Sequence, residues 1–230
     1  MGIRVAWVGV GVMGKHMCRH LLDGGHSCSV YSRTASKCDD LVSAGAKLCA
    51  SPKEAAAGAD IVFTMVGAPS DVESVTLGQD GVLASLRPGG VLVDMTTSTP
   101  SLAERIAEQA QAGSVFALDA PVSGGDVGAK AGSLSIMCGG SEEALTKAMP
   151  LLQLMGGSIA HMGGPGALTL TLTLTLTLTL TLTLTLTYHA PMPTGGSTSE
   201  DPSPPVLRVW VRVRIGFYSP RPTDLLSYCY

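Results

Sequence analysis

The sequence is poor in several residue classes, and each scarcity excludes a class of protein. Aromatic residues make up only 4% and charged residues only 14% of the 230 residues. The 15 Lys and Arg residues stand against 18 Asp and Glu residues, so the net charge of −3 argues against a strongly basic nucleic-acid-binding protein. Hydrophobic residues reach 45%, which is enough to bury a core and argues against global disorder.

The sequence also lacks a CxxC pair and any cysteine spacing typical of metal ligands. We therefore expect reduced, mostly buried thiols and a reducing compartment. The chain begins without a basic region followed by an apolar stretch, and Ala6 stands where a myristoylation signal needs Ser or Thr. The cytoplasm is the expected location, with an organelle as the alternative. The cysteines are Cys18, Cys28, Cys38, Cys49, Cys138 and Cys229.

Lysine is missing after Lys147, and the composition changes at Ala167. We predict three parts: a nucleotide-binding α/β domain over 1–167, a Leu-Thr repeat over 168–187, and a disordered tail rich in Pro, Gly and Ser over 188–230. The repeat has the period of a strand and the length of a membrane span. Its threonines weaken the case for a membrane segment, and an aggregation-prone strand is a second alternative. We favour a translated dinucleotide repeat or a wrong-frame sequence with no selected structure.

Residues 1–167 alternate between strand-like apolar runs and helical patterns, which predicts a Rossmann-like, doubly wound, mainly parallel sheet with helices on both faces. In such a sheet the ligand crevice lies at the carboxyl ends of the strands. The expected strands are 3–8, 28–31, 61–66, 91–95, 115–118 and 134–137. The expected helices are 13–23, 35–44, 53–58, 70–77, 101–112 and 141–155.

A GxGxxG motif follows the first predicted strand and opens the first predicted helix, the context in which this motif binds a dinucleotide. Gly9 allows the tight turn, Gly11 lets backbone amides approach a pyrophosphate, and Gly14 permits close packing of helix on strand. The predicted cofactor loop comprises Gly9, Val10, Gly11, Val12, Met13 and Gly14.

The end of the second predicted strand carries no carboxylate, although an NAD site offers one there to the ribose hydroxyls. Arg33 stands in this region between Ser32 and Thr34, and these side chains can bind a 2′-phosphate. The sequence therefore favours NADP over NAD. A solvated arginine in a turn is the alternative interpretation of Arg33.

Two further strands end in loops rich in hydroxyls or glycines. Thr96, Thr97, Ser98 and Thr99 follow the strand 91–95, and Ser98 or Thr99 can serve simply as a helix cap. The stretch 119–132 contains four glycines and Ser123, and we read it as a loop that can hold a small carboxylate.

These motifs together resemble the β-hydroxyacid dehydrogenase family over residues 1–167, above all Asp119-Ala-Pro-Val-Ser-Gly-Gly125. The family includes 3-hydroxyisobutyrate dehydrogenases and glyoxylate/succinic semialdehyde reductases and is related to 6-phosphogluconate dehydrogenase. The resemblance implies an NADP-binding domain followed by a helical domain, and hydride transfer between NADP(H) and a small hydroxy acid or semialdehyde. It also implies cofactor contacts by Met65, Val66 and Thr97, and substrate contacts by Thr96, Ser123, Gly124 and Gly125.

The chain departs from the family after Ala167. The resemblance places a catalytic lysine and an asparagine at positions that hold Leu172 and Leu176, and neither residue type occurs downstream. The resemblance implies that this lysine is the general acid that protonates the carbonyl oxygen, a role that typically raises the rate about 10²–10⁴-fold. Lys130, Lys147 and His161 are candidate replacements, and we assign the role to none of them.

We therefore expect a nucleotide-binding domain of an oxidoreductase, without competent catalysis in this chain. One alternative is an active NADPH-dependent reductase, if the natural chain continues as in the family. Another is a non-enzymatic module that senses NADP. The expected partner of an active form is a small carboxylate-bearing substrate; we expect no nucleic acid, no metal and no membrane. The family often forms homo-oligomers through the part that is absent here, so we do not predict one.

Overall fold

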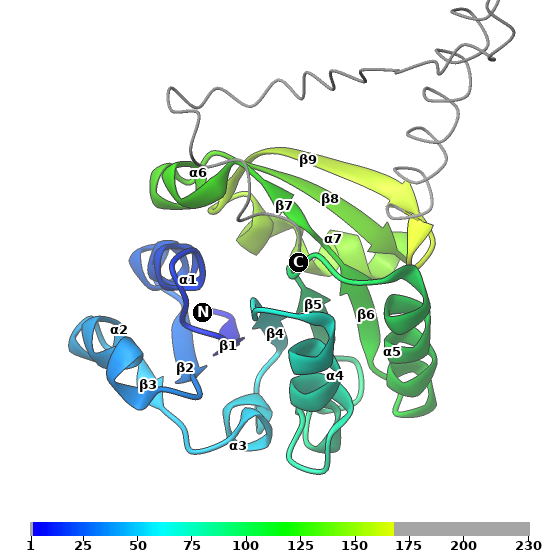
Figure 1. The fold of residues 1–230 in the computed structure, drawn as a ribbon, viewed down its shortest axis with the longest axis horizontal. Coiled ribbons are helices and arrows are strands. Elements are labelled where there is room, and N and C mark those ends of the chain that lie inside the picture. The colour runs from blue at the N-terminus through cyan, green and yellow to red at the C-terminus, as the bar shows by residue number, and fades with distance from the viewer. Residues whose placement is uncertain (1, 168–230) are drawn as a thin grey trace, which may run out of the picture. The chain divides into compact units, whose positions relative to one another are not determined.

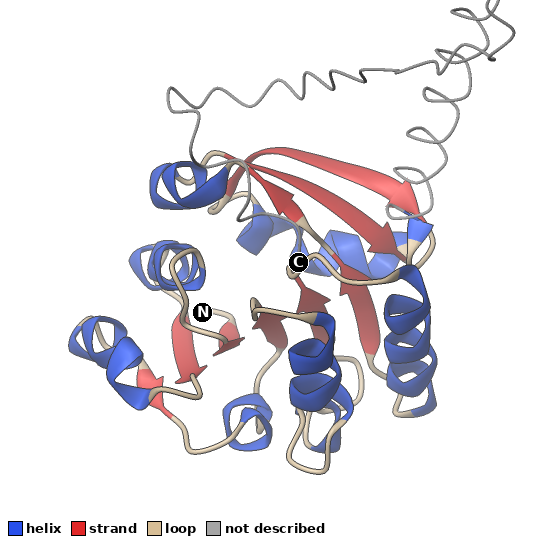
Figure 2. Cartoon of the chain, in the orientation of Figure 1, coloured by secondary structure: helices blue, strands red, loops and turns tan. Residues whose placement is uncertain are grey.

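Buried apolar strands form the centre of the structure, a computed structural model that describes residues 2–167. Six parallel strands lie side by side in the order β3, β2, β1, β4, β5 and β6 (Figures 1 and 2). The chain moves outward from β1 in both directions, which is the doubly wound arrangement predicted from the sequence. These strands are β1 (Arg4–Val8), β2 (Ser27–Tyr31), β3 (Lys47–Leu48), β4 (Ile61–Thr64), β5 (Val91–Asp94) and β6 (Phe116–Asp119).

Three further strands extend the sheet beyond β6. They are β7 (Val122–Ser123), β8 (Leu134–Gly140) and β9 (Gly156–Gly163). Strand β8 runs antiparallel to β6 and β7 and parallel to β9. The sheet is thus mainly parallel, as predicted, with one antiparallel extension. The predicted repeat at 168–187 and tail at 188–230 lie outside the described residues.

Hydroxyl side chains define where three of the helices begin. Ser51, Thr99 and Ser141 each accept a bond from the backbone N–H three residues ahead, which satisfies one of the free donors of a first turn. The helices are α1 (Gly14–Asp23), α2 (Asp39–Ser43), α3 (Pro52–Ala56), α4 (Pro69–Leu77), α5 (Pro100–Ala112), α6 (Gly125–Ala131) and α7 (Glu142–Leu152), and the short 3-10 helices are η1 (Ala35–Cys38) and η2 (Val82–Ala84).

Each face of the sheet buries its own apolar core, because alternate residues of a strand point to opposite faces. In β1, Trp7 packs into one core and Val8 into the other. The first core receives apolar residues of α1, α2 and α7, including Leu21; the second receives those of α3, α4 and α5, including Ile106. Trp7 stacks on Phe63 with ring centroids 5.4 Å apart. Burying one such large side chain contributes about 1.5–3 kcal/mol.

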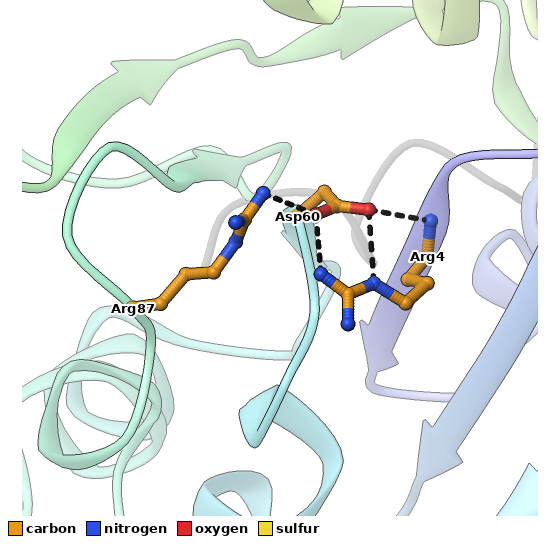
Figure 3. A network of polar contacts seen from close by, with 3 residues as sticks. All are labelled: Arg4, Asp60 and Arg87. Atoms are coloured by element: carbon orange, nitrogen blue, oxygen red, sulfur yellow. Dashed lines mark hydrogen bonds and ion pairs between the residues drawn. The ribbon is translucent and has the colours of Figure 1, made fainter.

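An ionic cluster joins the amino ends of the strands, at the edge opposite the carboxyl ends (Figure 3). Asp60, directly before β4, accepts bonds from the backbone N–H of Arg4 at 2.9 Å and from its guanidinium at 2.9 and 3.2 Å. Arg87 also pairs with this carboxylate. The arginines hold the pKa of Asp60 below its ordinary value. Through these contacts the cluster links β1, the start of β4 and the segment before β5.

The five cysteines within the described range are free and buried, which confirms the expected thiols; Cys229 lies outside that range. Within residues 2–167, no helix is both long enough and apolar enough to cross a membrane.

Candidate functional site

The turn between β1 and α1 contains three glycines, of which Gly9 and Gly14 leave no room for a side chain. Gly9 has a φ of 102°, and a Cβ there would lie 2.1 Å from the carbonyl oxygen of Met65. A Cβ on Gly14 would lie 2.2 Å from the carbonyl oxygen of Gly9. A Cβ on Gly11 would meet nothing within 4 Å, because this glycine faces open space. Side chains therefore do not fit at Gly9 and Gly14, and the role of both residues in cofactor binding stays a prediction.

The open side of this turn presents backbone donors. Helix α1 has no side-chain cap, and the N–H groups of Val12 and Met13 have no hydrogen-bond acceptor among the described residues. Free N–H groups together with the positive end of a helix dipole bind anions. The turn can therefore receive a phosphate or pyrophosphate.

A cleft of about 490 Å³ runs from this turn along the carboxyl ends of β1, β2 and β4, which is the size of an ordinary ligand site. With the single exception of Thr97, the predicted cofactor residues line it together. They are Gly9, Val10, Gly11, Val12, Met13, Gly14, Ser32, Arg33, Thr34, Met65 and Val66. Thr97 is exposed and lies outside the lining.

The cleft also contains charged residues that sequence analysis did not select. Lys37, on η1, lies four residues after Arg33 and makes no ion pair with any described residue. Asp71, in the first turn of α4, pairs with Arg33: its Oδ1 lies 3.3 Å from Nη1. Because Lys37 lies close to Arg33 in sequence, sequence analysis could have selected it as a cofactor-binding residue. Asp71 is separated from Arg33 by 38 residues, so no local pattern indicates that the two meet.

A buried network connects the carboxyl ends of β4 and β5. The Thr64 hydroxyl donates to Asp94 Oδ1 at 2.6 Å, and the Thr96 backbone N–H donates to the same atom at 3.2 Å. The Thr96 hydroxyl accepts a bond from the backbone N–H of Val66 at 3.0 Å. Burial raises the pKa of Asp94 to about 6, although the bonds from Thr64 and Thr96 lower it. Thr96 is therefore engaged in fixing the loop after β4, and its predicted substrate contact stays a prediction.

Thr99, and not Ser98, caps helix α5, with its hydroxyl 3.4 Å from the N–H of Leu102. The Ser98 hydroxyl is buried and has no hydrogen-bond partner within the described chain. It lines a small cavity of about 20 Å³ together with Asp94 and Asp119, which is enough for one water molecule.

The glycine-rich stretch 119–132 contains a short strand and a helix, so the expectation of a loop was wrong. Ser123 ends β7, Gly124 precedes α6 with a φ of 129°, and Gly125 begins that helix with a φ of 60°. Helix α6 is held on α1 by a bond of 2.9 Å between His20 Nε2 and the carbonyl oxygen of Ala129. The predicted substrate residues in this stretch are exposed. They are not among the residues that line the cofactor cleft.

Asp119, at the end of β6, holds the last described segment. The backbone N–H of Gly166 donates to its Oδ1 at 2.9 Å. Gly139, its partner across β8, leaves space for the carboxylate, because a Cβ there would lie 2.6 Å from the same oxygen. Burial raises the pKa of Asp119.

Two of the three candidate replacement acids already have partners elsewhere in the fold. Lys147 pairs with Glu143 at 3.0 Å and lies 3.8 Å above the centre of the Phe116 ring. His161 Nε2 bonds to the carbonyl oxygen of Gly140 at 2.8 Å. Lys130 is exposed in the last turn of α6. None of the three lines the cofactor cleft.

Comparison with known proteins identifies the family. Residues 4–164 match the sequence model described as the NAD binding domain of 6-phosphogluconate dehydrogenase. Over 154 residues the chain is 52% identical to the probable 3-hydroxyisobutyrate dehydrogenase-like 1, mitochondrial, of Arabidopsis thaliana, covering 66% of this chain and 46% of the relative. The chain belongs to the β-hydroxyacid dehydrogenase family. The resemblance in the sequence is thus confirmed, and residues 4–164 are the NAD-binding domain of a 3-hydroxyisobutyrate dehydrogenase-like oxidoreductase.

Two of the proteins that this chain resembles are named together with a pyridine nucleotide. The NAD-dependent L-serine dehydrogenase of Pseudomonas aeruginosa is 42% identical over 164 residues, or 71% of this chain and 55% of the relative. A structure titled "Psf3 in complex with NADP+ and 2-OPP" is 31% identical, with a TM-score of 0.67 over 70% of this chain and 57% of that one. Both names agree with a site for a pyridine nucleotide.

The structural match to a β-hydroxyacid dehydrogenase is equally clear in the fold. The 3-hydroxyisobutyrate dehydrogenase of Mycobacterium tuberculosis, solved with L-serine, is 34% identical and superimposes with a TM-score of 0.68. The match covers 73% of this chain and 56% of that one. The chain thus spans about half the length of the relatives that it matches.

Proposed function

We propose that this dehydrogenase-family chain binds NADP(H) in the cleft at the carboxyl ends of β1, β2 and β4. The free N–H groups of Val12 and Met13 receive the pyrophosphate, and Gly11 lets it approach the backbone. The observation that carries the preference for NADP is a pair of cations, Arg33 and Lys37, beside the hydroxyl of Thr34 in the cleft. NAD is the alternative ligand, and its ribose hydroxyls would then lie beside Arg33, Lys37 and Thr34.

Arg33→Asp tests this preference. The substitution places a carboxylate where a 2′-phosphate binds, so we expect NADPH affinity to fall about tenfold or more, which corresponds to at least 1.4 kcal/mol, with a smaller change for NADH. Arg19→Asp is the matched control, because Arg19 is exposed on α1 and pairs with Asp23 away from the cleft. Unchanged NADPH affinity in Arg33→Asp, measured by fluorescence titration, would remove the basis for NADP.

The reaction class that we propose is hydride transfer to or from a small hydroxy acid or semialdehyde. When bound, NADPH would supply the hydride for reduction of a semialdehyde and NADP+ would accept it from a hydroxy acid, and Met65, Val66 and Thr97 would contact the cofactor. Ser123 and Gly124, with Gly125 and Thr96, bind the substrate carboxylate through hydroxyl and backbone donors. The dehydrogenase names of the relatives support a small substrate of this kind.

We further propose that the 230-residue chain lacks competent catalysis, because Leu172 occupies the place of the family's lysine. Loss of a general acid is expected to cost about 10²–10⁴ in rate. NADPH consumption with a panel of small semialdehydes tests this. Turnover at a rate ordinary for an enzyme would contradict the proposal and favour an active reductase. Binding of NADPH without turnover, combined with capture of a partner that depends on residues 168–230, would favour a sensing module.

For the location we propose the cytoplasm, with an organelle as the alternative, since the Arabidopsis relative is named as mitochondrial. Microscopy of the natural chain fused at its carboxyl end to a fluorescent protein separates the two.

A further inference from the structure

The guanidinium of Arg33 forms an ion pair with Asp71 in this structure. Its Nη1 lies 3.3 Å from Oδ1 of Asp71, which comes from a different element, the first turn of α4. Both side chains line the cofactor cleft. The Arg33 side chain is 86% exposed and that of Asp71 only 35%. The arginine is therefore the adaptable member of the pair, and the carboxylate is the fixed one.

Two features describe the surroundings of the Asp71 carboxylate. Negative charge in the first turn of a helix is stabilised by the helix dipole, and α4 begins two residues earlier at Pro69. Oδ2 also lies close to the backbone at Gly67, where an added Cβ would be only 3.2 Å away. Gly67 itself lines the cleft. The Asp71 carboxylate is thus part of the cleft wall, on the side that Arg33 contacts.

This charge affects the two nucleotides differently. A 2′-phosphate carries a charge of about −1.5 to −2, as other phosphate monoesters do, and it needs the guanidinium that Asp71 holds. Its binding exchanges the Arg33–Asp71 pair for an Arg33–phosphate pair and leaves a carboxylate beside the phosphate. The 2′-hydroxyl of NADH requires no such exchange. Lys37, which has no ion pair among the described residues, is available to either nucleotide.

We propose that Asp71 is a specificity-determining residue that competes with the 2′-phosphate for Arg33 and so reduces the preference for NADPH over NADH. The inference rests on the proposed nucleotide-binding function. An exposed ion pair of this kind is worth about 0.2–1 kcal/mol, so its removal shifts the preference by about 1.4- to fivefold. Salt screens the effect.

The test measures dissociation constants of NADPH and NADH for the full chain and for Asp71→Asn, at low and at high salt. We expect Asp71→Asn to bind NADPH about 1.4- to fivefold more tightly and NADH unchanged, with a smaller gain at high salt. Glu73→Gln is the matched control: it removes the same charge from the same helix, but Glu73 pairs with Arg105 and lies outside the cleft. Asp71→Ser provides a second variant, in case the amide retains a bond to Arg33.

The outcomes are distinguishable. Equal gains for NADPH and NADH, or an equal gain in Glu73→Gln, would overturn the proposal in favour of a general charge effect. Weaker NADPH binding in both Asp71 variants would overturn it in the opposite sense, since Asp71 would then position Arg33 for the phosphate. If the folded parent chain binds neither nucleotide, the proposed function itself fails, and the role of Asp71 falls with it.

Discussion

At the scale of single residues, the carboxyl group of Asp94 shows how the site obtains its rigidity. It is 6% exposed and accepts bonds from the Thr64 hydroxyl and the Thr96 backbone N–H. Thr96 in turn accepts the N–H of Val66, which lines the cofactor cleft. One buried side chain thus fixes the loops after two adjacent strands, and burial raises the pKa of that side chain to about 6.

The raised pKa of Asp94 predicts a pH dependence of stability. Because the folded protein holds this proton more tightly than the unfolded chain, the contribution of Asp94 is fully present below pH 3.8 and is lost as the pH rises through about 6. The loss is on the order of 3 kcal/mol. Asp119, whose pKa burial also raises, adds to the loss in the same direction.

Asp94→Asn is expected to reduce this loss, since the amide oxygen can still accept both bonds while the titration is removed. Urea unfolding across the same pH range measures it, with Asp126→Asn on the exposed part of α6 as the control. Parallel pH profiles for Asp94→Asn and the parent chain would contradict the account.

Residues close together in sequence were predictable members of the site, and residues brought together only by folding were not. The glycine loop and Ser32–Thr34 each follow one strand, so a local pattern predicts their place. Asp71 reaches Arg33 from α4, and no local signal records that meeting. Lys37 was predictable in the same way, because it lies on η1 only four residues after Arg33.

At the scale of elements, the turn between β1 and α1 contains one glycine that the fold requires, Gly9, and one that we expect only nucleotide binding to require, Gly11. Gly9→Ala would place a Cβ 2.1 Å from a carbonyl oxygen at a φ of 102°, so we expect a loss of about 2–4 kcal/mol in unfolding free energy. Gly11→Ala meets nothing within 4 Å of the protein. We expect it to fold with ordinary stability and to bind NADPH about tenfold or more weakly, because the methyl group obstructs the pyrophosphate.

Thermal unfolding and NADPH titration of the two glycine variants test this separation. Normal stability in Gly9→Ala would contradict the geometry of the turn. Undiminished NADPH binding in Gly11→Ala would contradict the placement of the pyrophosphate.

The central strands were predictable because they are continuous apolar runs, and the elements that were missed are those in which neighbours overrule composition. Helix α6 contains Gly125 and Gly128, which disfavour a helix, yet its contacts with α1 hold it. Strand β9 contains glycines and exposed residues, and its pairing with β8 defines it. The predicted helix 35–44 divides into η1 and α2, and the predicted helix 141–155 ends at Leu152.

At the scale of the whole molecule, the carboxyl ends and the amino ends of the parallel strands differ in function. The carboxyl ends carry loops that are open to a ligand, whereas the amino ends are joined by the Arg4–Asp60–Arg87 cluster (Figure 3). This division is expected for parallel α/β sheets, in which the ligand lies beyond the carboxyl ends. Changes at the amino ends should therefore alter stability and leave the cleft intact.

Asp60→Asn tests this division. Because the pKa of Asp60 is lowered in the folded state, its contribution is present above pH 3.8 and is lost as the pH falls through the folded-state pKa. We expect the variant to lose about 1 kcal/mol of unfolding free energy at neutral pH, since solvent screens much of the attraction. NADPH affinity should not change. A change in NADPH affinity without a loss of stability would contradict the account.

The most direct test of the central claim is a calorimetric titration of the complete 230-residue chain with NADPH, with folding verified by circular dichroism. The account predicts saturable binding of one nucleotide per chain, weakened in Gly11→Ala. A folded chain that binds neither NADPH nor NADH would contradict it.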